Sequence, residues 1–221
     1  MVVISEKLRQ RLFDANPFWS GSFEFNYVER DVYAEIKRFA SEKQVVALCG
    51  LRRVGKTTML YKLISDLLKE SKPEQVLYFS FDDFVGEPRD VVDAFLEIHG
   101  FEPRFLFFDE IQKVGNWSEK IKLLYDSGKY KIFLSGSESL FLRKGTKETL
   151  AGRIFEIEVS ILSFREYLRF VGKSHLAVKP LLHENELRKA FADYVLIGGF
   201  PELIGKTDEV LIKTYLLDLV D

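Results

Sequence analysis

Short apolar runs recur through the first 160 residues and are separated by polar or Gly/Pro segments, so they predict strands. Most of these runs are almost continuously apolar, as parallel strands covered on both faces must be. Helical spacing of apolar positions lies between several of them. This alternation predicts an open parallel α/β sheet with right-handed crossovers. The strands are expected at 44–49, 75–81, 104–110, 131–136 and 153–159, and the helices between them at 59–68, 88–99 and 117–127.

Composition and charge narrow the class of protein. The 221 residues are 47% apolar and 30% charged, which is typical of a globular protein with a substantial core. A formal net charge of -2 gives no overall electrostatic footprint for nucleic acid. The single cysteine excludes an internal disulfide, and the sequence contains neither a secretory leader nor an apolar run long enough for a membrane span. We therefore expect a cytoplasmic protein that uses neither a membrane nor nucleic acid as a partner.

A phosphate-binding motif lies between the first predicted strand and the helix that follows it. The stretch "GLRRVGKT", Gly50–Thr57, fits the pattern of Gly, four residues and Gly-Lys-Thr. Gly50 and Gly55 allow the backbone to turn its N–H groups inward around phosphates, and the helix N-terminus adds partial positive charge. Lys56 is expected to reach the β- and γ-phosphates, and the Thr57 hydroxyl is expected to ligate Mg²⁺.

The other residues of this loop are also candidates for nucleotide contact. Leu51 and Val54 contribute backbone to the turn. Two arginines and a second threonine could contact phosphate directly, or could equally occupy solvated positions of the loop. The candidates are Leu51, Arg52, Arg53, Val54 and Thr58.

Two adjacent acids, Asp109 and Glu110, follow the apolar run "FLFF" and so lie at the carboxyl end of a predicted parallel strand. Ligands of open α/β sheets bind at this end. Asp109 is suited to orient Mg²⁺, and Glu110 is suited to accept a proton from a water that attacks the γ-phosphate. Such a pair could instead cap a turn or form an ion pair. Together with the phosphate loop, Glu110 favours hydrolysis over phosphate transfer, because a hydrolase needs only a positioned water.

Several further motifs occur in a fixed order along nearly the whole chain, and with them the sequence resembles the archaeal-type AAA+ ATPases that are related to the STAND signalling ATPases. The motifs are "NPFW", "GLRRVGKTTML", "YFSFDDF", "FFDEIQKVGNW", "FLSGSES", "LAGRIFEIEVSILSFREYL" and "YVLIGGFPEL". The resemblance implies a five-stranded ASCE-type P-loop sheet in the order 5-1-4-3-2. It also implies that Ser135 or Ser137 is a sensor between the γ-phosphate and Glu110. The choice between them is open, and Ser137 could instead be a helix N-cap.

The resemblance assigns roles to three more residues. Arg153 matches the Gly-Arg of the family, where a cation in cis or from a neighbouring subunit stabilises γ-phosphate charge, although a surface ion pair is an alternative. Pro201 matches the Gly-x-Pro of the helical lid and would pack near the nucleotide base, or it could simply end a helix. Arg30 matches a family arginine ahead of the first strand and is a candidate for a position near the base.

After about residue 160 the strand signals fade and helical patterns continue to the end of the sequence. We divide the chain into an N-terminal segment, 1–40, which should pack beside the nucleotide end of the sheet, a P-loop core, 41–160, and a helical lid, 161–221. The last helical pattern has no stop signal, so we expect this chain to be part of a longer protein. Family members usually continue with a further C-terminal domain.

The expected function is Mg²⁺-dependent binding and hydrolysis of ATP, with the nucleotide state coupled to movement of the lid. ATP rather than GTP rests on the resemblance and on the absence of a guanine-recognition motif. One alternative is a switch that is gated by ATP and ADP and turns over little, and another is a small-molecule kinase. Expected partners are the nucleotide itself and either further copies of the chain or a C-terminal domain beyond it.

Overall fold

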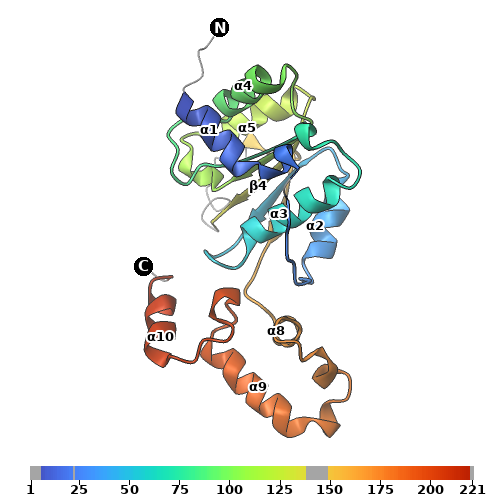
Figure 1. Ribbon diagram of the computed structural model, residues 1–221, viewed down its shortest axis with the longest axis vertical. Coiled ribbons are helices and arrows are strands. Elements are labelled where there is room, and N and C mark those ends of the chain that lie inside the picture. Colours follow the sequence, from blue (N-terminus) through green and yellow to red (C-terminus); the bar gives the residue numbers. More distant parts are fainter. Residues whose placement is uncertain (1–5, 22, 138–148, 220–221) are drawn as a thin grey trace.

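The computed structural model describes residues 6–21, 23–137 and 149–219, and a parallel sheet forms the centre of the part that precedes the C-terminal helices (Figure 1). The strand order is β2-β3-β4-β1-β5, which confirms the predicted order. Every neighbouring pair of strands is parallel. The carboxyl ends of β1 and β3 therefore lie at the same edge of the sheet, with β4 between them. The strands span Val45–Cys49 (β1), Val76–Ser80 (β2), Phe105–Asp109 (β3), Lys131–Gly136 (β4) and Ile154–Glu158 (β5).

The strands are almost continuously apolar because each sends side chains into two separate cores. In β1, Val46 and Leu48 belong to one core and Val45 and Ala47 to the other, and all four are fully buried. Helices α2 (Tyr33–Ala40) and α3 (Lys56–Leu67) pack on the first core, to which the C-terminal helices also contribute buried residues. Helices α1 (Glu6–Ala15), α4 (Pro88–His99) and α5 (Trp117–Asp126) pack on the second. The result is a three-layer sandwich of helices, sheet and helices.

The N-terminal residues cover the edge strand β2 instead of clustering at one end of the sheet. The side chain of Asn16 donates to the carbonyl oxygen of Tyr78 at 2.9 Å and accepts from the Tyr78 amide at 2.7 Å, as a neighbouring strand would. The indole of Trp19, in the short helix η1 (Pro17–Ser20), donates to the carbonyl oxygen of Val76 at 2.9 Å. These contacts close an edge that would otherwise expose unpaired backbone groups. Of this segment, Arg30 contacts the phosphate loop, through the carbonyl oxygen of Val54.

The C-terminal helices gather beyond the end of the sheet to which β5 leads (Figure 1). They are α8 (Phe164–Phe170), α9 (Glu184–Leu196) and α10 (Glu209–Leu217), joined by the short helices η4 (Ser174–Ala177), η5 (Pro180–Leu182) and η6 (Pro201–Leu203). A capping box begins α8: the Ser163 hydroxyl accepts from the Glu166 amide, and the Glu166 carboxylate accepts from the Ser163 amide. Among the described residues, no helix is long and apolar enough to cross a membrane.

Candidate functional site

The phosphate loop leaves β1 at Cys49 and enters α3 at Lys56 through a backbone that requires two glycines. Gly55 has φ 98°, in the left-handed region. Gly50 has φ 149°, and a Cβ atom there would lie 2.2 Å from the carbonyl oxygen of Val159. The amide of Val159 in turn donates to the carbonyl oxygen of Cys49 at 2.7 Å. Val159, directly after β5, therefore packs against the start of the phosphate loop and is hydrogen bonded to it.

Lys56 lies at the centre of the turn and is only 5% exposed. Its ammonium group donates to the carbonyl oxygens of Gly50 at 3.0 Å and Leu51 at 2.7 Å. Burial lowers the pKa of Lys56, while the nearby carboxylates of Glu110 and Asp109 act in the opposite direction. A buried cation surrounded by a curled backbone, at the N-terminus of a helix, is suited to hold an anion.

The carboxylate of Asp109, at the end of β3, accepts hydrogen bonds from four donors. Its Oδ2 accepts from the hydroxyls of Thr57 at 2.7 Å and Tyr78 at 3.0 Å. Its Oδ1 accepts from the Ser135 hydroxyl and from the Glu110 amide, the latter at 3.2 Å. Burial raises the pKa of Asp109, while the bonds from Thr57 and Tyr78 oppose that shift. Four donors from separate elements fix the direction of this carboxylate next to the phosphate loop.

Glu110 follows in a strained conformation. Its backbone is left-handed, with φ 53° and ψ 40°, although it carries a side chain. Such conformations cost about 1–3 kcal/mol and persist where the surrounding structure enforces them, often at functional sites. The side-chain amide of Gln112, in η3 (Ile111–Lys113), donates to the Glu110 carboxylate. The Glu110 amide also lies 3.4 Å from the Ser135 hydroxyl.

Of the two candidate serines, Ser135 contacts the acid pair and is fully buried at the end of β4. Ser137 follows β4 directly. The segment that Ser137 would cap as a helix begins at residue 138, outside the described residues.

Some of the remaining residues of the phosphate loop are buried and others are exposed to solvent. Val54 is fully buried, whereas Leu51 and Arg52 are exposed. Arg53 has φ 64° and extends toward the C-terminal helices. Its Nη1 lies 4.0 Å from the Glu202 carboxylate. The half-buried Thr58 lies in the first turn of α3.

Arg53 also lies over an aromatic ring of α10, with its guanidinium carbon 4.6 Å from the centre of the Tyr215 ring. The Tyr215 hydroxyl donates to the Glu202 carboxylate at 2.9 Å. The phosphate loop and the C-terminal helices therefore touch through Arg53.

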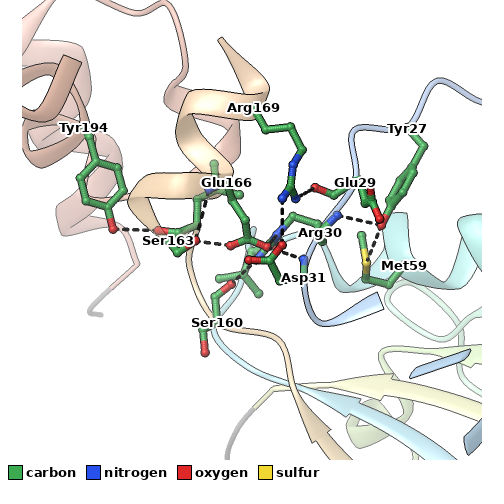
Figure 2. Close-up of polar contacts among 12 residues, drawn as sticks. Tyr27, Glu29, Arg30, Asp31, Met59, Ser160, Ser163, Glu166, Arg169 and Tyr194 are labelled. Carbon is green, nitrogen blue, oxygen red and sulfur yellow. Dashed lines mark hydrogen bonds and ion pairs between the residues drawn. The ribbon is translucent and has the colours of Figure 1, made fainter. Parts of the chain in front are cut away.

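Arg30 lies on the other side of the loop and is 3% exposed. Its guanidinium donates to the carbonyl oxygens of Val54 at 2.9 Å and Ser160 at 2.8 Å, and to the Glu166 carboxylate at 2.8 Å (Figure 2). Each guanidinium nitrogen thus has an oxygen partner within the protein. A cavity of about 330 Å³ adjoins this pair. Its walls come from residues 30–32, Glu158, residues 160–163, Glu166 and Tyr194.

Pro201 begins η6 and follows two glycines with positive φ, Gly198 and Gly199. Gly199 packs so closely on the segment after β5 that a Cβ atom there would lie 2.9 Å from the carbonyl oxygen of Leu162. The Leu162 amide donates to the carbonyl oxygen of Gly199 at 2.8 Å. The "GGFP" motif therefore contacts Leu162 in the wall of the cavity beside Arg30. Glu202, in the turn that follows the motif, lies near Arg53.

Arg153 is not brought to this site within the chain. It directly precedes β5, and its carbonyl oxygen accepts from the amide of Val45 at the amino end of β1. The phosphate loop leaves the opposite end of β1, so the parallel register separates the two. Arg153 instead forms an exposed ion pair with Asp126, with its Nε 3.1 Å from the carboxylate. A contact between Arg153 and γ-phosphate in cis is thus contradicted by the register.

Three residues of the site were missed by sequence reasoning: Tyr78, Gln112 and Glu166. Tyr78 lies within an apolar strand run, where its ring predicts only packing. Gln112 follows the acid pair in a turn whose geometry the sequence does not specify. Glu166 did carry a signal, because Ser163 and Glu166 have the spacing of a capping box.

The oxygen donors of Thr57 and Asp109 are the chemistry that Mg²⁺ prefers, and they lie in contact. Among the described residues, no cluster of three or more His, Cys, Asp or Glu side chains could hold a metal by itself. A magnesium ion at Thr57 and Asp109 would therefore take its remaining ligands from the nucleotide and from water.

Comparison with known families and structures agrees with this geometry. A family model described as "AAA domain" matches residues 42–168, more than half of the chain. An uncharacterised protein of Methanocaldococcus jannaschii is 32% identical over 200 residues, which cover 88% of this chain and 43% of that protein. One of Haemophilus influenzae is 27% identical, covering 88% of this chain and 48% of that protein. The chain thus spans less than half the length of these relatives.

A search of solved structures finds the same fold. The Saccharomyces cerevisiae Hsp104:casein complex aligns with a TM-score of 0.52 and 15% identity, covering 85% of this chain and 38% of that one. At this identity the likeness concerns the fold alone.

Proposed function

Because the chain belongs to the AAA-domain family of P-loop NTPases, we propose that it binds ATP together with Mg²⁺ and hydrolyses it. The observation that carries the proposal is the arrangement of Asp109, whose carboxylate is held by Thr57 on the phosphate loop and by Ser135 beside Glu110. This arrangement supports the proposal of a phosphate site, a cation site and a carboxylate base that lie next to one another.

We assign the binding of phosphates to the loop and to Lys56. The loop amides and the N-terminus of α3 would face the phosphates, and the Lys56 ammonium would exchange its carbonyl partners for phosphate oxygens. Thr57 and Asp109 would hold Mg²⁺, which supplies positive charge to neutralise the phosphates. The base would occupy the cavity beside Arg30, whose wall residue Leu162 contacts Gly199 of the "GGFP" motif.

Glu110 is the proposed general base. A water attacks the γ-phosphorus, the bond from that phosphorus to the bridging oxygen breaks, and the proton of the water passes to the Glu110 carboxylate. Gln112 donates to Oε2 of this carboxylate, so the proton would pass to Oε1. The Ser135 hydroxyl contacts the backbone amide of the same residue.

A second function, a nucleotide-gated switch with little turnover, is favoured by two specific contacts. Gln112 restrains the base, and Arg53 of the loop is shared with the lid residues Glu202 and Tyr215. Both contacts would change with the nucleotide. Arg153 would act only on a neighbouring copy of the chain, as an arginine supplied in trans.

Replacing Glu110 by Gln tests the proposed hydrolysis. The variant should bind ATP as tightly as the parent chain and hydrolyse it about 10²–10⁴-fold more slowly, because the amide cannot accept the proton. Release of inorganic phosphate and equilibrium binding of ATP measure the two effects. Lys56→Ala should instead lose binding, and Glu119→Gln, an exposed change on α5, should alter neither.

The outcomes separate the candidate functions. Unchanged hydrolysis in Glu110→Gln would remove that residue from the mechanism. Little turnover in the parent chain, with ADP bound after purification, would support the switch. Phosphate that appears on an added acceptor instead of in solution would indicate a kinase.

A further inference from the structure

The ion pair of Arg30 and Glu166 is the most deeply buried one among the described residues, with side chains 3% and 6% exposed. It joins three segments that are far apart in the sequence: the residues ahead of α2, the phosphate loop, and the start of α8. In Figure 2 the Arg30 guanidinium lies beside Glu166, in the first turn of α8, and Ser160, in the segment before that helix. Burial of two charges is unfavourable unless both are paired and hydrogen bonded, so this pair demands a full set of partners.

On the side of the loop, Arg30 fixes the orientation of the peptide group between Val54 and Gly55. Its Nη1 donates to the carbonyl oxygen of Val54 at 2.9 Å. In a planar trans peptide the C=O and N–H groups point in opposite directions, so anchoring the Val54 oxygen also fixes the direction of the Gly55 N–H. Gly55 precedes Lys56 in the turn and has φ 98°, a conformation that glycine adopts freely and could also leave freely. The contact with Arg30 thus orients an amide of the phosphate cradle.

On the side of the lid, the same guanidinium holds α8 and the segment before it. Its Nη2 donates to the carbonyl oxygen of Ser160 at 2.8 Å, and its Nε donates to Glu166 in the first turn of α8. The Glu166 carboxylate also accepts from the amides of Asp31 and Ser163, each at 2.9 Å. The helix therefore cannot rotate relative to the loop without breaking a buried, charged hydrogen bond.

We propose that Arg30 is a positioning residue that links the phosphate loop to the lid: through Val54 it sets the Gly55 amide for phosphate, and through Glu166 it makes α8 follow the conformation of the loop. This inference rests on the proposed nucleotide binding. It identifies Arg30 as the residue that couples nucleotide binding to the lid. It also gives Arg30 a role other than contact with the base, because its donors are committed to protein oxygens.

The test compares Arg30→Gln and Arg30→Lys with the parent chain in binding of ADP and in hydrogen–deuterium exchange. In the parent chain, saturating ADP should slow exchange in both the loop and α8. In Arg30→Gln the affinity should fall about tenfold or more, as expected if the competent loop is populated in about a tenth of the molecules. At saturating ADP the loop should again be protected in this variant, but α8 should not be. Arg30→Lys should lie between the two.

Arg169→Gln is the matched control, because Arg169 joins the same segments without touching the loop. It donates to the carbonyl oxygen of Glu29 and to the Asp31 carboxylate, at 2.6 and 3.0 Å. This variant should keep the affinity for ADP and the protection of α8. If Arg30→Gln does not fold, Glu166→Gln removes the negative charge and leaves only one acceptor oxygen for Arg30 and the two backbone amides, and it should show the same loss of α8 protection.

The outcomes are separable from those for the proposed function. If the parent chain fails to bind nucleotide, the proposed function fails. If the parent chain binds ADP, while a folded Arg30→Gln variant binds it equally well and retains ligand-induced protection of α8, the pair is only a structural contact and the inference is overturned. Loss of affinity that Arg169→Gln reproduces would also overturn it.

Discussion

At the scale of single residues, Tyr78 makes a contact that is testable without disturbing the fold. Its hydroxyl donates to the Asp109 oxygen that also accepts from Thr57. Tyr78→Phe keeps the ring in the core but leaves the carboxylate freer to rotate. We expect the Mg²⁺ concentration for half-maximal ATP hydrolysis to rise about fivefold, which corresponds to about 1 kcal/mol, with little change at saturating Mg²⁺.

A titration of Mg²⁺ at fixed ATP measures this effect. Tyr33→Phe is the matched control, since the Tyr33 hydroxyl likewise donates to a carboxylate, that of Asp66, at 2.7 Å but near the other end of α3. Its Mg²⁺ dependence should equal that of the parent chain. An unchanged dependence in Tyr78→Phe would mean that this tyrosine only packs.

The residues of the site differ in how far the sequence could reveal them. Gly50 and Lys56 were predictable because their roles depend on local backbone and on a fixed spacing. Asp109 was predictable because an acid at the end of an apolar strand must lie at an edge of the sheet. The partners of Arg30 were not, because they lie 24, 130 and 136 residues away in the sequence and depend on how the lid packs.

At the scale of elements, Lys131 joins the end of α2 to the beginning of the sheet. Its ammonium donates to the carbonyl oxygens of Phe39, Glu42 and Gln44, at 3.1, 2.7 and 2.6 Å. Lys131→Met leaves these carbonyls without that donor. We expect the free energy of unfolding in urea to fall by about 1–3 kcal/mol. Lys72→Met, at an exposed position, should change it by less than about 0.5 kcal/mol. Equal stability of the two variants would mean that the hydrogen bonds from Lys131 to these three carbonyl oxygens do not stabilise the fold.

The strands and most helices followed from the pattern of apolar residues, since that pattern reflects burial on two faces. The order of the strands did not, and came from the resemblance, because periodicity does not specify which strands pair. Helix α1 was not predicted: it buries only Leu8 and Leu12 along its length. The closure of the β2 edge by Asn16 depends on a contact across 62 residues, which no local pattern encodes.

At the scale of the whole molecule, the phosphate loop contacts the lid from two sides. The exposed contact, Arg53 with Glu202 and Tyr215, involves groups that water can readily replace. The buried contact runs from Val54 through Arg30 to Glu166. The exposed contact can therefore be broken at a lower cost than the buried one, which fixes α8 to the phosphate loop.

The buried pair also makes the stability of the molecule depend on pH. Burial alone would raise the pKa of Glu166, but hydrogen bonds from the Ser163 amide, Arg30 and the Asp31 amide hold that pKa below its usual value. Because the folded pKa is lowered, the ionised carboxylate contributes stability at pH values above the unfolded pKa of about 4.3. That contribution is lost as pH falls through the folded pKa.

The difference in unfolding free energy between the parent chain and Glu166→Gln isolates this contribution, since the other carboxylates cancel. It should be roughly 1–3 kcal/mol at pH 7, where the variant leaves the Arg30 charge buried without a counter-ion. It should shrink toward zero below pH 4, because a protonated Glu166 resembles glutamine. Urea unfolding between pH 3 and 7 measures it, with the exposed Glu184→Gln as a control that should show almost no difference. A difference that stays constant with pH would mean that the charge of Glu166 does not stabilise the fold.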